Sequence, residues 1–133
     1  MHGIRRFSLA TTLCALMGTL WHPVCLAADE AIVARIEAME AGFPVQVLGS
    51  RLMAHQALSA FYGANGYQPA WKSAELRRQL IDSVEQASHD GLNPADYHAD
   101  ILSGLALRPM SDFSEDLRAD LDLLFSDAFL MLF

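Results

Sequence analysis

Cysteine is absent from residues 28–133, because the two cysteines of the chain, Cys14 and Cys25, both lie near its start. This part of the chain therefore has no thiol nucleophile and cannot be stapled by a disulfide. Basic residues are also scarce in it, and 7 of them against 16 acidic residues give a formal charge of −9. A surface that acidic repels phosphate groups, which proteins bind through lysine and arginine. Nucleic acid is thereby excluded as a partner.

The sequence also lacks the patterns of common catalytic and metal sites. His55, His89 and His98 are not spaced as zinc ligands are, and no G-x-S-x-G turn occurs. Asp120 and Asp122 would point apart on a helix, which predicts solvated surface. We therefore assign no catalytic residue, no metal ligand and no cofactor, and expect His98 to be a partly buried hydrogen-bonding residue. An independent hydrolase that uses two facing carboxylates is the enzymatic alternative.

An export signal is present at the start of the chain. Arg5 and Arg6 precede an uncharged run over residues 7–28, and the small residues Cys25 and Ala27 suit cleavage after Ala27. We predict a signal peptide over residues 1–27 and a mature periplasmic domain over residues 28–133. The alternative is an uncleaved anchor, because the run is close to the roughly 20 residues that span a bilayer. In either case the chain would meet the membrane only through this segment.

The remaining sequence predicts a mainly α fold, a small domain of about five helices with at most one short strand. Apolar residues recur at helical spacing, and cap residues such as Ser50, Ser73 and Asn93 precede the expected helices. Pro94 follows Asn93 at the first helical position, where proline is favoured. Residues 43–48 are the one candidate strand. The expected helices cover residues 29–41, 51–62, 74–89, 94–103 and 114–133.

The last expected helix has the strongest apolar period in the chain and starts at Ser111 or Ser114. No glycine, proline or basic last turn stops it, and it runs into five apolar residues at 129–133. A finished domain normally covers such a surface. We therefore expect this helix to be truncated and its apolar end to promote self-association.

Ring-bearing residues gather between the second and third expected helices. Tyr67, Pro69 and Trp71 alternate along a segment that we expect to be extended and packed over the neighbouring helices. A core role is favoured for Trp71. Flat rings also stack on sugars and peptides, so Tyr62, Tyr67, Trp71 and Tyr97 are the candidate substrate-binding residues.

The order of these motifs resembles a known family. A Y-x-P-x-W block at residues 67–71 precedes a D-G-L-x-P-x-D-Y-H block at residues 90–98, and acidic, leucine-rich blocks follow at 120–124 and 126–130. Over residues 48–130 this order is similar to the scaffold region of periplasmic murein L,D-transpeptidases. In that family the scaffold accompanies a peptidoglycan-binding module and a catalytic domain with an S-x-G-C-x-R cysteine motif, which forms 3→3 peptidoglycan cross-links.

The resemblance implies a scaffold function without chemistry of its own. The cysteine motif is absent from this sequence, so no catalytic residue carries over to any position, and the chain alone is expected to be inactive. Its implied partners are peptidoglycan or the missing catalytic domain. The alternative is a stand-alone periplasmic module that binds peptidoglycan or a protein.

Overall fold

The computed structural model describes residues 28–133, so the predicted signal peptide at residues 1–27 lies outside the described residues. The mainly α fold is confirmed: this part of the chain holds five α-helices and one antiparallel pair of two-residue strands. The helices are α1 (Glu30–Glu40), α2 (His55–Ala64), α3 (Ala74–Ala87), α4 (Ala99–Leu102) and α5 (Glu115–Leu132). The strands are β1 (Gln46–Val47) and β2 (Ser50–Arg51), and the 3₁₀ turns are η1 (Ser88–Asp90), η2 (Pro94–Tyr97) and η3 (Met110–Asp112).

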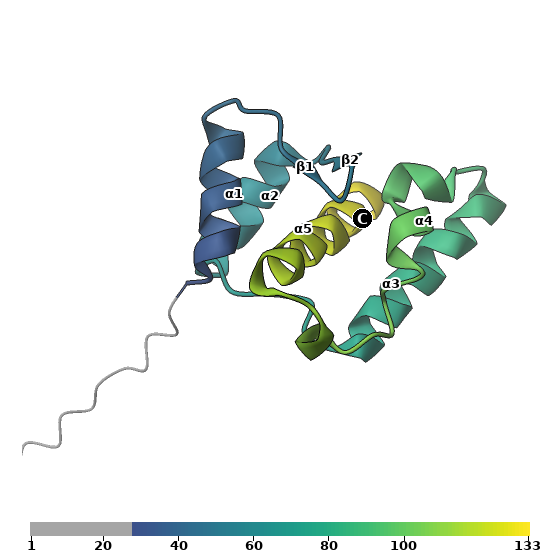
Figure 1. The fold of residues 1–133 in the computed structure, drawn as a ribbon. Coiled ribbons are helices and arrows are strands. Elements are labelled where there is room, and N and C mark those ends of the chain that lie inside the picture. The colour runs from purple at the N-terminus through teal and green to yellow at the C-terminus, as the bar shows by residue number, and fades with distance from the viewer. Residues whose placement is uncertain (1–27) are drawn as a thin grey trace, which may run out of the picture.

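Helix α5 is the centre of the fold. Figure 1 shows it lying between the α1–α2 pair on one side and α3 with α4 on the other, and it contacts all four. Every residue from Leu121 to Ala128 is buried. The predicted apolar stripe therefore describes only part of this helix, because neighbours surround its middle on every side.

The helix starts follow from capping chemistry. The side chains of Asp29, Ser73, Asn93 and Ser114 each accept a hydrogen bond from a backbone N–H of the turn that they precede. Each satisfies N–H groups that have no partner within the turn. Ser73, Asn93 and Ser114 agree with the sequence prediction, Ser114 being the one of its two alternatives that is found. Asp29 was expected to be the first residue of its helix and instead caps it.

The predicted second helix, residues 51–62 with Ser50 as its cap, starts too early. Ser50 and Arg51 form β2, which pairs with β1 in the register Gln46↔Arg51 and Val47↔Ser50. The turn between them has φ of 50° at Leu48 and 78° at Gly49, the left-handed pair that tight hairpins require. The region expected to hold at most one short strand is thus a small hairpin, and α2 begins at His55.

The predicted helix over residues 94–103 is broken in two. His98 has φ of 61°, a left-handed conformation that separates η2 from α4. The interruption turns the His98 side chain to a carboxylate of α5, which is described below. In the preceding turn Gly91 is left-handed and the Leu92 N–H donates back to the Ala87 carbonyl at 3.1 Å, which closes the end of α3.

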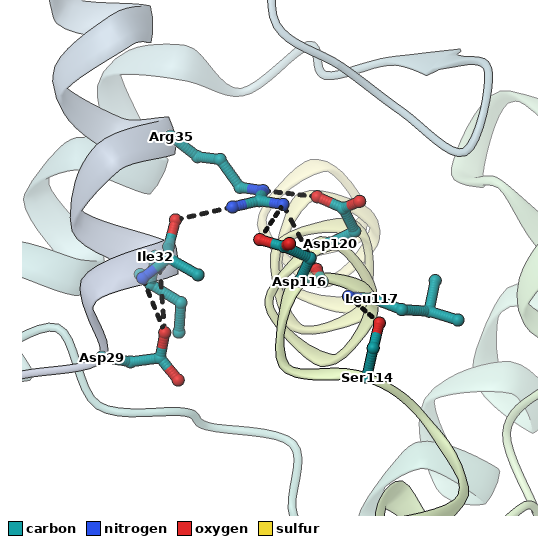
Figure 2. Close-up of polar contacts among 8 residues, drawn as sticks. Asp29, Ile32, Arg35, Ser114, Asp116, Leu117 and Asp120 are labelled. Atoms are coloured by element: carbon teal, nitrogen blue, oxygen red, sulfur yellow. Dashed lines mark hydrogen bonds and ion pairs between the residues drawn. The ribbon is translucent and has the colours of Figure 1, made fainter.

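Helix α1 is pinned to α5 by one arginine as well as by its buried face. Ile32, Ile36 and Met39 are buried, as the apolar stripe of this helix predicted. Figure 2 shows the Arg35 guanidinium reaching across to the carboxylates of Asp116 and Asp120 on α5.

None of the helices described between residues 28 and 133 is long and apolar enough to cross a membrane.

Candidate functional site

Three polar side chains are buried on α5, and they organise the segments around it. Asp122, Ser126 and Asp127 expose 2%, 1% and 0% of their surface. The prediction that Asp122 is solvated surface is wrong, because α5 is enclosed where that residue lies. Asp120, its predicted companion, is partly buried and paired with Arg35.

The Asp122 carboxylate holds the chain that follows α2. It accepts hydrogen bonds from the backbone N–H groups of Ala70 and Trp71, both at 2.9 Å, and from the Tyr62 hydroxyl at 2.6 Å. Buried charges are stable only when they are bonded in this way. The residues from Tyr67 to Lys72, called here the aromatic segment, are therefore tied to the central helix through their main chain.

A relay of hydroxyl groups extends this contact. The Trp71 indole N–H donates to Ser126 Oγ at 2.8 Å, and Ser126 Oγ lies 2.8 Å from the Tyr62 hydroxyl oxygen. Each hydroxyl has one proton, and Tyr62 uses its own on Asp122, so Ser126 donates to Tyr62. The bonds run in one direction from Trp71 through Ser126 and Tyr62 to Asp122.

The electrostatics of this cluster favour fixed protonation states. Burial raises the pKa of the Tyr62 hydroxyl, and the neighbouring Asp122 charge raises it further. Burial also raises the pKa of the Asp122 carboxyl, against its hydrogen bonds, which favour the charged form. Tyr62 therefore keeps its proton and acts as a donor, which suits a structural bond and not a proton-transfer step.

A buried arginine holds the aromatic segment from the opposite side. Arg77, which exposes 1% of its surface, donates to the carbonyl oxygens of Trp71 at 2.6 Å and Lys72 at 2.9 Å. It also donates to the carbonyls of Ala106 and Arg108, both at 2.9 Å. Burial lowers the pKa of Arg77, with the Asp122 charge acting in the other direction. The aromatic segment is thus hydrogen-bonded on both sides: its N–H groups donate to the Asp122 carboxylate of α5, and its carbonyls accept from the Arg77 guanidinium of α3.

Asp127 plays a similar part at the start of α2. Its carboxylate accepts from the N–H of Ala54 at 2.7 Å and of Met53 at 3.0 Å, where the helix has no side-chain cap of its own. Asp127 also lies 2.7 Å from His98 Nε2, and since a carboxylate only accepts, that nitrogen carries the proton. His98 is buried and hydrogen-bonded, in line with its predicted role.

The four candidate substrate-binding residues lie in two places. Tyr62 is fully buried and Trp71 exposes 9%, and Asp122 joins them. Tyr67 is partly buried with φ of 56°, so the aromatic segment does not begin in the extended conformation that was expected. Tyr97 lies apart, in η2, beside His98. Their binding of a substrate stays a prediction.

A pocket of about 350 Å³ opens beside the aromatic segment. Its lining includes Trp71 and Lys72 of the aromatic segment and the acidic residues Asp29 and Asp122. A second, more open hollow of about 550 Å³ is lined by Tyr97, His98 and four neighbours. Within residues 28–133 no histidine, cysteine or acid cluster could hold a metal ion.

The sequence carried a signal for the buried polar residues that was not used. Asp122 and Asp127 stand inside the run LDLLFSDAFL, where apolar residues occupy all faces of the helix. An acid in such a run has no solvated side to occupy. Arg77 is harder to find, because residue type favours burial of its apolar neighbour Leu76, whereas Arg77 is buried and Leu76 is 49% exposed.

Comparison with known protein families gives one match. A family model described as Scaffold domain matches residues 56–133, which is more than half of the chain. The matched range starts in α2 and includes the aromatic segment, Arg77 and the buried polar residues of α5. No curated protein and no solved structure matches the chain.

Proposed function

The chain belongs to the Scaffold domain family, and we propose that it is the exported scaffold part of a periplasmic murein L,D-transpeptidase. In this proposal it supports the formation of 3→3 cross-links in peptidoglycan during cell-wall remodelling. The match to a scaffold model over residues 56–133 carries the proposal. The ordered Y-x-P-x-W and D-G-L-x-P-x-D-Y-H blocks supply the link to transpeptidases.

The geometry supports a positioning role. Both sequence blocks end at a residue bonded to an aspartate of α5: Trp71 to Asp122, and His98 to Asp127. Residues 28–133 contain no cysteine, so an acyl transfer by a thiol would have to occur on another part or another chain. The proposed partner is therefore a cysteine-containing catalytic domain, and the proposed location is the periplasm.

The proposal is tested in the native host by cell-wall composition. Removing the coding sequence is expected to lower the fraction of 3→3 cross-linked muropeptides, measured by liquid chromatography and mass spectrometry of digested walls. Re-expression of the wild-type chain in its natural sequence context should restore them. The exposed control Asp100→Ala should restore them equally, whereas Asp122→Ala should not. An unchanged 3→3 fraction in the deletion strain would overturn the transpeptidase link.

A second test reads the coding sequence beyond codon 133 in all frames. An S-x-G-C-x-R motif encoded there is expected if the catalytic domain belongs to the same gene. Its absence would remove this form of the proposal and leave a catalytic domain on a separate chain, which a cross-linking experiment with the purified chain can identify. Fractionation and N-terminal sequencing test export, with cleavage expected after Ala27.

The pocket beside Trp71 favours one alternative, a stand-alone module that binds peptidoglycan or a protein. The apolar end of α5 adds surface for a partner or a second copy, since Phe129 and Phe133 expose 37% and 78% of their area. Retention of the purified chain on isolated sacculi would support wall binding, and a chain that stays in the supernatant would contradict it. Size-exclusion chromatography tests self-association, with a monodisperse monomer as the contrary result.

A further inference from the structure

The pocket beside the aromatic segment has a wall that other residues hold in place. Trp71 forms part of this wall, and its main chain is fixed by Asp122 on one side and by Arg77 on the other. Its ring is further fixed by stacking on Phe125, with ring centroids 5.7 Å apart. Ligand pockets are usually formed before the ligand arrives, and about 350 Å³ lies at the lower end of their size range.

The pocket offers cations that are available to a ligand. Lys72, the single lysine of the chain, is exposed, and its ammonium has no ion pair or hydrogen bond within residues 28–133. Arg118 also lines the pocket, and its ion pair is a long one, 3.8 Å to Glu115, whose side chain is 91% exposed. Such a pair contributes little, so the guanidinium can turn to a ligand anion. A carboxylate in the pocket would meet both groups.

Two carboxylates line the same pocket and favour a cation. Asp29 uses Oδ1 to cap α1 through the N–H groups of Ala31 and Ile32, and its Oδ2 accepts no hydrogen bond from residues 28–133. Asp122 lies close enough for the Asp29 charge to add to the effect of burial in raising the pKa of the Asp122 carboxyl. An ammonium group bound at Asp29 Oδ2 would offset that repulsion without displacing the hydrogen bonds of Asp122.

The rest of the lining is apolar. Pro69, Met110 and Trp71 complete the lining beside the charged residues. An aliphatic side chain bound there would lose contact with water against these three residues.

We propose that this pocket binds a small zwitterion, a free amino acid or a dipeptide with an aliphatic side chain. The ligand carboxylate meets Lys72 and Arg118, the ligand ammonium meets Asp29 Oδ2 beside the buried negative charge of Asp122, and the side chain packs against Trp71 and Met110. Groups of opposite charge around one apolar wall select this class over simple anions, simple amines and neutral solutes.

The chain provides its own reporter for a binding test. Trp21 and Trp71 are its two tryptophans, so the full chain carrying Trp21→Phe reports on Trp71 alone by fluorescence. Titration with the dipeptide Ala-Leu is expected to give a saturable change in emission. N-acetylation or C-terminal amidation of the dipeptide should each weaken binding roughly tenfold or more, because each removes a charge-assisted bond. An N-acetyl dipeptide that binds as well as Ala-Leu would overturn the zwitterion assignment.

A matched pair of variants locates the site. Lys72→Met keeps the apolar stem and is expected to weaken Ala-Leu binding roughly tenfold. Arg51→Met, an exposed cation that lines the other hollow, should leave it unchanged. Equal weakening by both variants, or none by Lys72→Met, would overturn the proposal.

Chemical modification gives an independent readout. Acylation of Lys72 followed by mass spectrometry should be slowed by saturating Ala-Leu and not by its amide. Absence of both a fluorescence change and protection would refute binding. These measurements use purified protein and small ligands, so their failure leaves the cross-linking test of the proposed function intact, and the converse also holds.

Discussion

Asp122 and Asp127 of α5 both bind backbone N–H groups of distant segments, yet the surroundings of the two carboxylates differ. Each accepts two backbone N–H groups of a segment that lies far away in sequence, 70–71 for Asp122 and 53–54 for Asp127. The third partner of Asp122 is a neutral phenol, Tyr62, whereas that of Asp127 is His98. The Asp122 segment is also bound by Arg77, and the Asp127 segment has no such second charge.

The difference indicates where the fold is most tightly specified. The aromatic segment is held through both its N–H and its carbonyl groups, so few other backbone paths would satisfy Asp122 and Arg77 together. The start of α2 is held by Asp127 at its N–H groups, as in an ordinary helix cap, and the Leu52 carbonyl oxygen before it lies 2.7 Å from Nε2 of His55 in the same helix. We expect removal of Asp122 to be the more damaging change.

The largest effect is expected for Asp122→Ala. It leaves the N–H groups of Ala70 and Trp71 without their charged acceptor, and the cost should be about 3 kcal/mol of unfolding free energy or more. Asp127→Ala should cost about 2 kcal/mol, at the upper end for a lost cap. Urea unfolding measures both, with Asp100→Ala as the exposed control. A larger loss for Asp127→Ala would reverse the ranking of the two sites.

Tyr62→Phe should have the next largest effect. It removes one donor to Asp122 while the two backbone donors remain, so a loss of about 1–2 kcal/mol is expected in the same unfolding experiment. The control is Tyr67→Phe, which alters a partly exposed ring and should stay within about 0.5 kcal/mol of wild type. Equal losses for the two variants would show that the hydroxyl relay contributes nothing.

His98→Asn tests the matching partner of Asp127. Asparagine tolerates the left-handed backbone at this position but is too short to replace the imidazole, so a loss of about 1 kcal/mol is expected from the missing bond alone. His89→Asn, at an exposed position, should cost nothing measurable. If His98→Asn cost more than Tyr62→Phe, the histidine would be the more important third partner.

The smallest effect concerns pH. The native pKa of Asp122 is raised by burial, so the folded protein holds this proton more tightly than the unfolded chain does. Its contribution to stability is present at low pH and declines as pH rises through the native pKa. The unfolding free energy of wild type relative to Asp122→Asn should therefore fall as the pH rises above about 4, the ordinary pKa of an aspartate. A difference that grows with pH would mean that the hydrogen bonds outweigh burial.

Local patterns in the sequence were sufficient for the helices and most of their starts. Ser73 and Asn93 cap where expected because capping depends on a few neighbouring residues. The hairpin at 46–51 was missed because Leu48 takes a left-handed backbone conformation, which a leucine in the sequence does not predict. The break at His98 was missed for another reason, since its partner Asp127 is 29 residues away.

The candidate site could be predicted only in outline. Tyr62 and Trp71 were named together, and the structure brings them to one carboxylate. Asp122 and Arg77 were placed on the surface or passed over, because a helix position shows its burial only when the packing of its neighbours is known. Apart from the Tyr62 hydroxyl, their partners are main-chain groups, which leave no residue-type signal in the sequence.

Arg77, whose guanidinium donates to four carbonyl groups, also couples the motions of two connecting segments, one between α2 and α3 and the other between α4 and α5. Its acceptors come from residues 71–72 and from residues 106 and 108, so neither connector can leave without stranding a buried charge. The two connectors should accordingly open together, as one cooperative unit, when the native protein fluctuates. Hydrogen exchange would then give the amides near both connectors a shared opening free energy, although more than 30 residues of chain separate them.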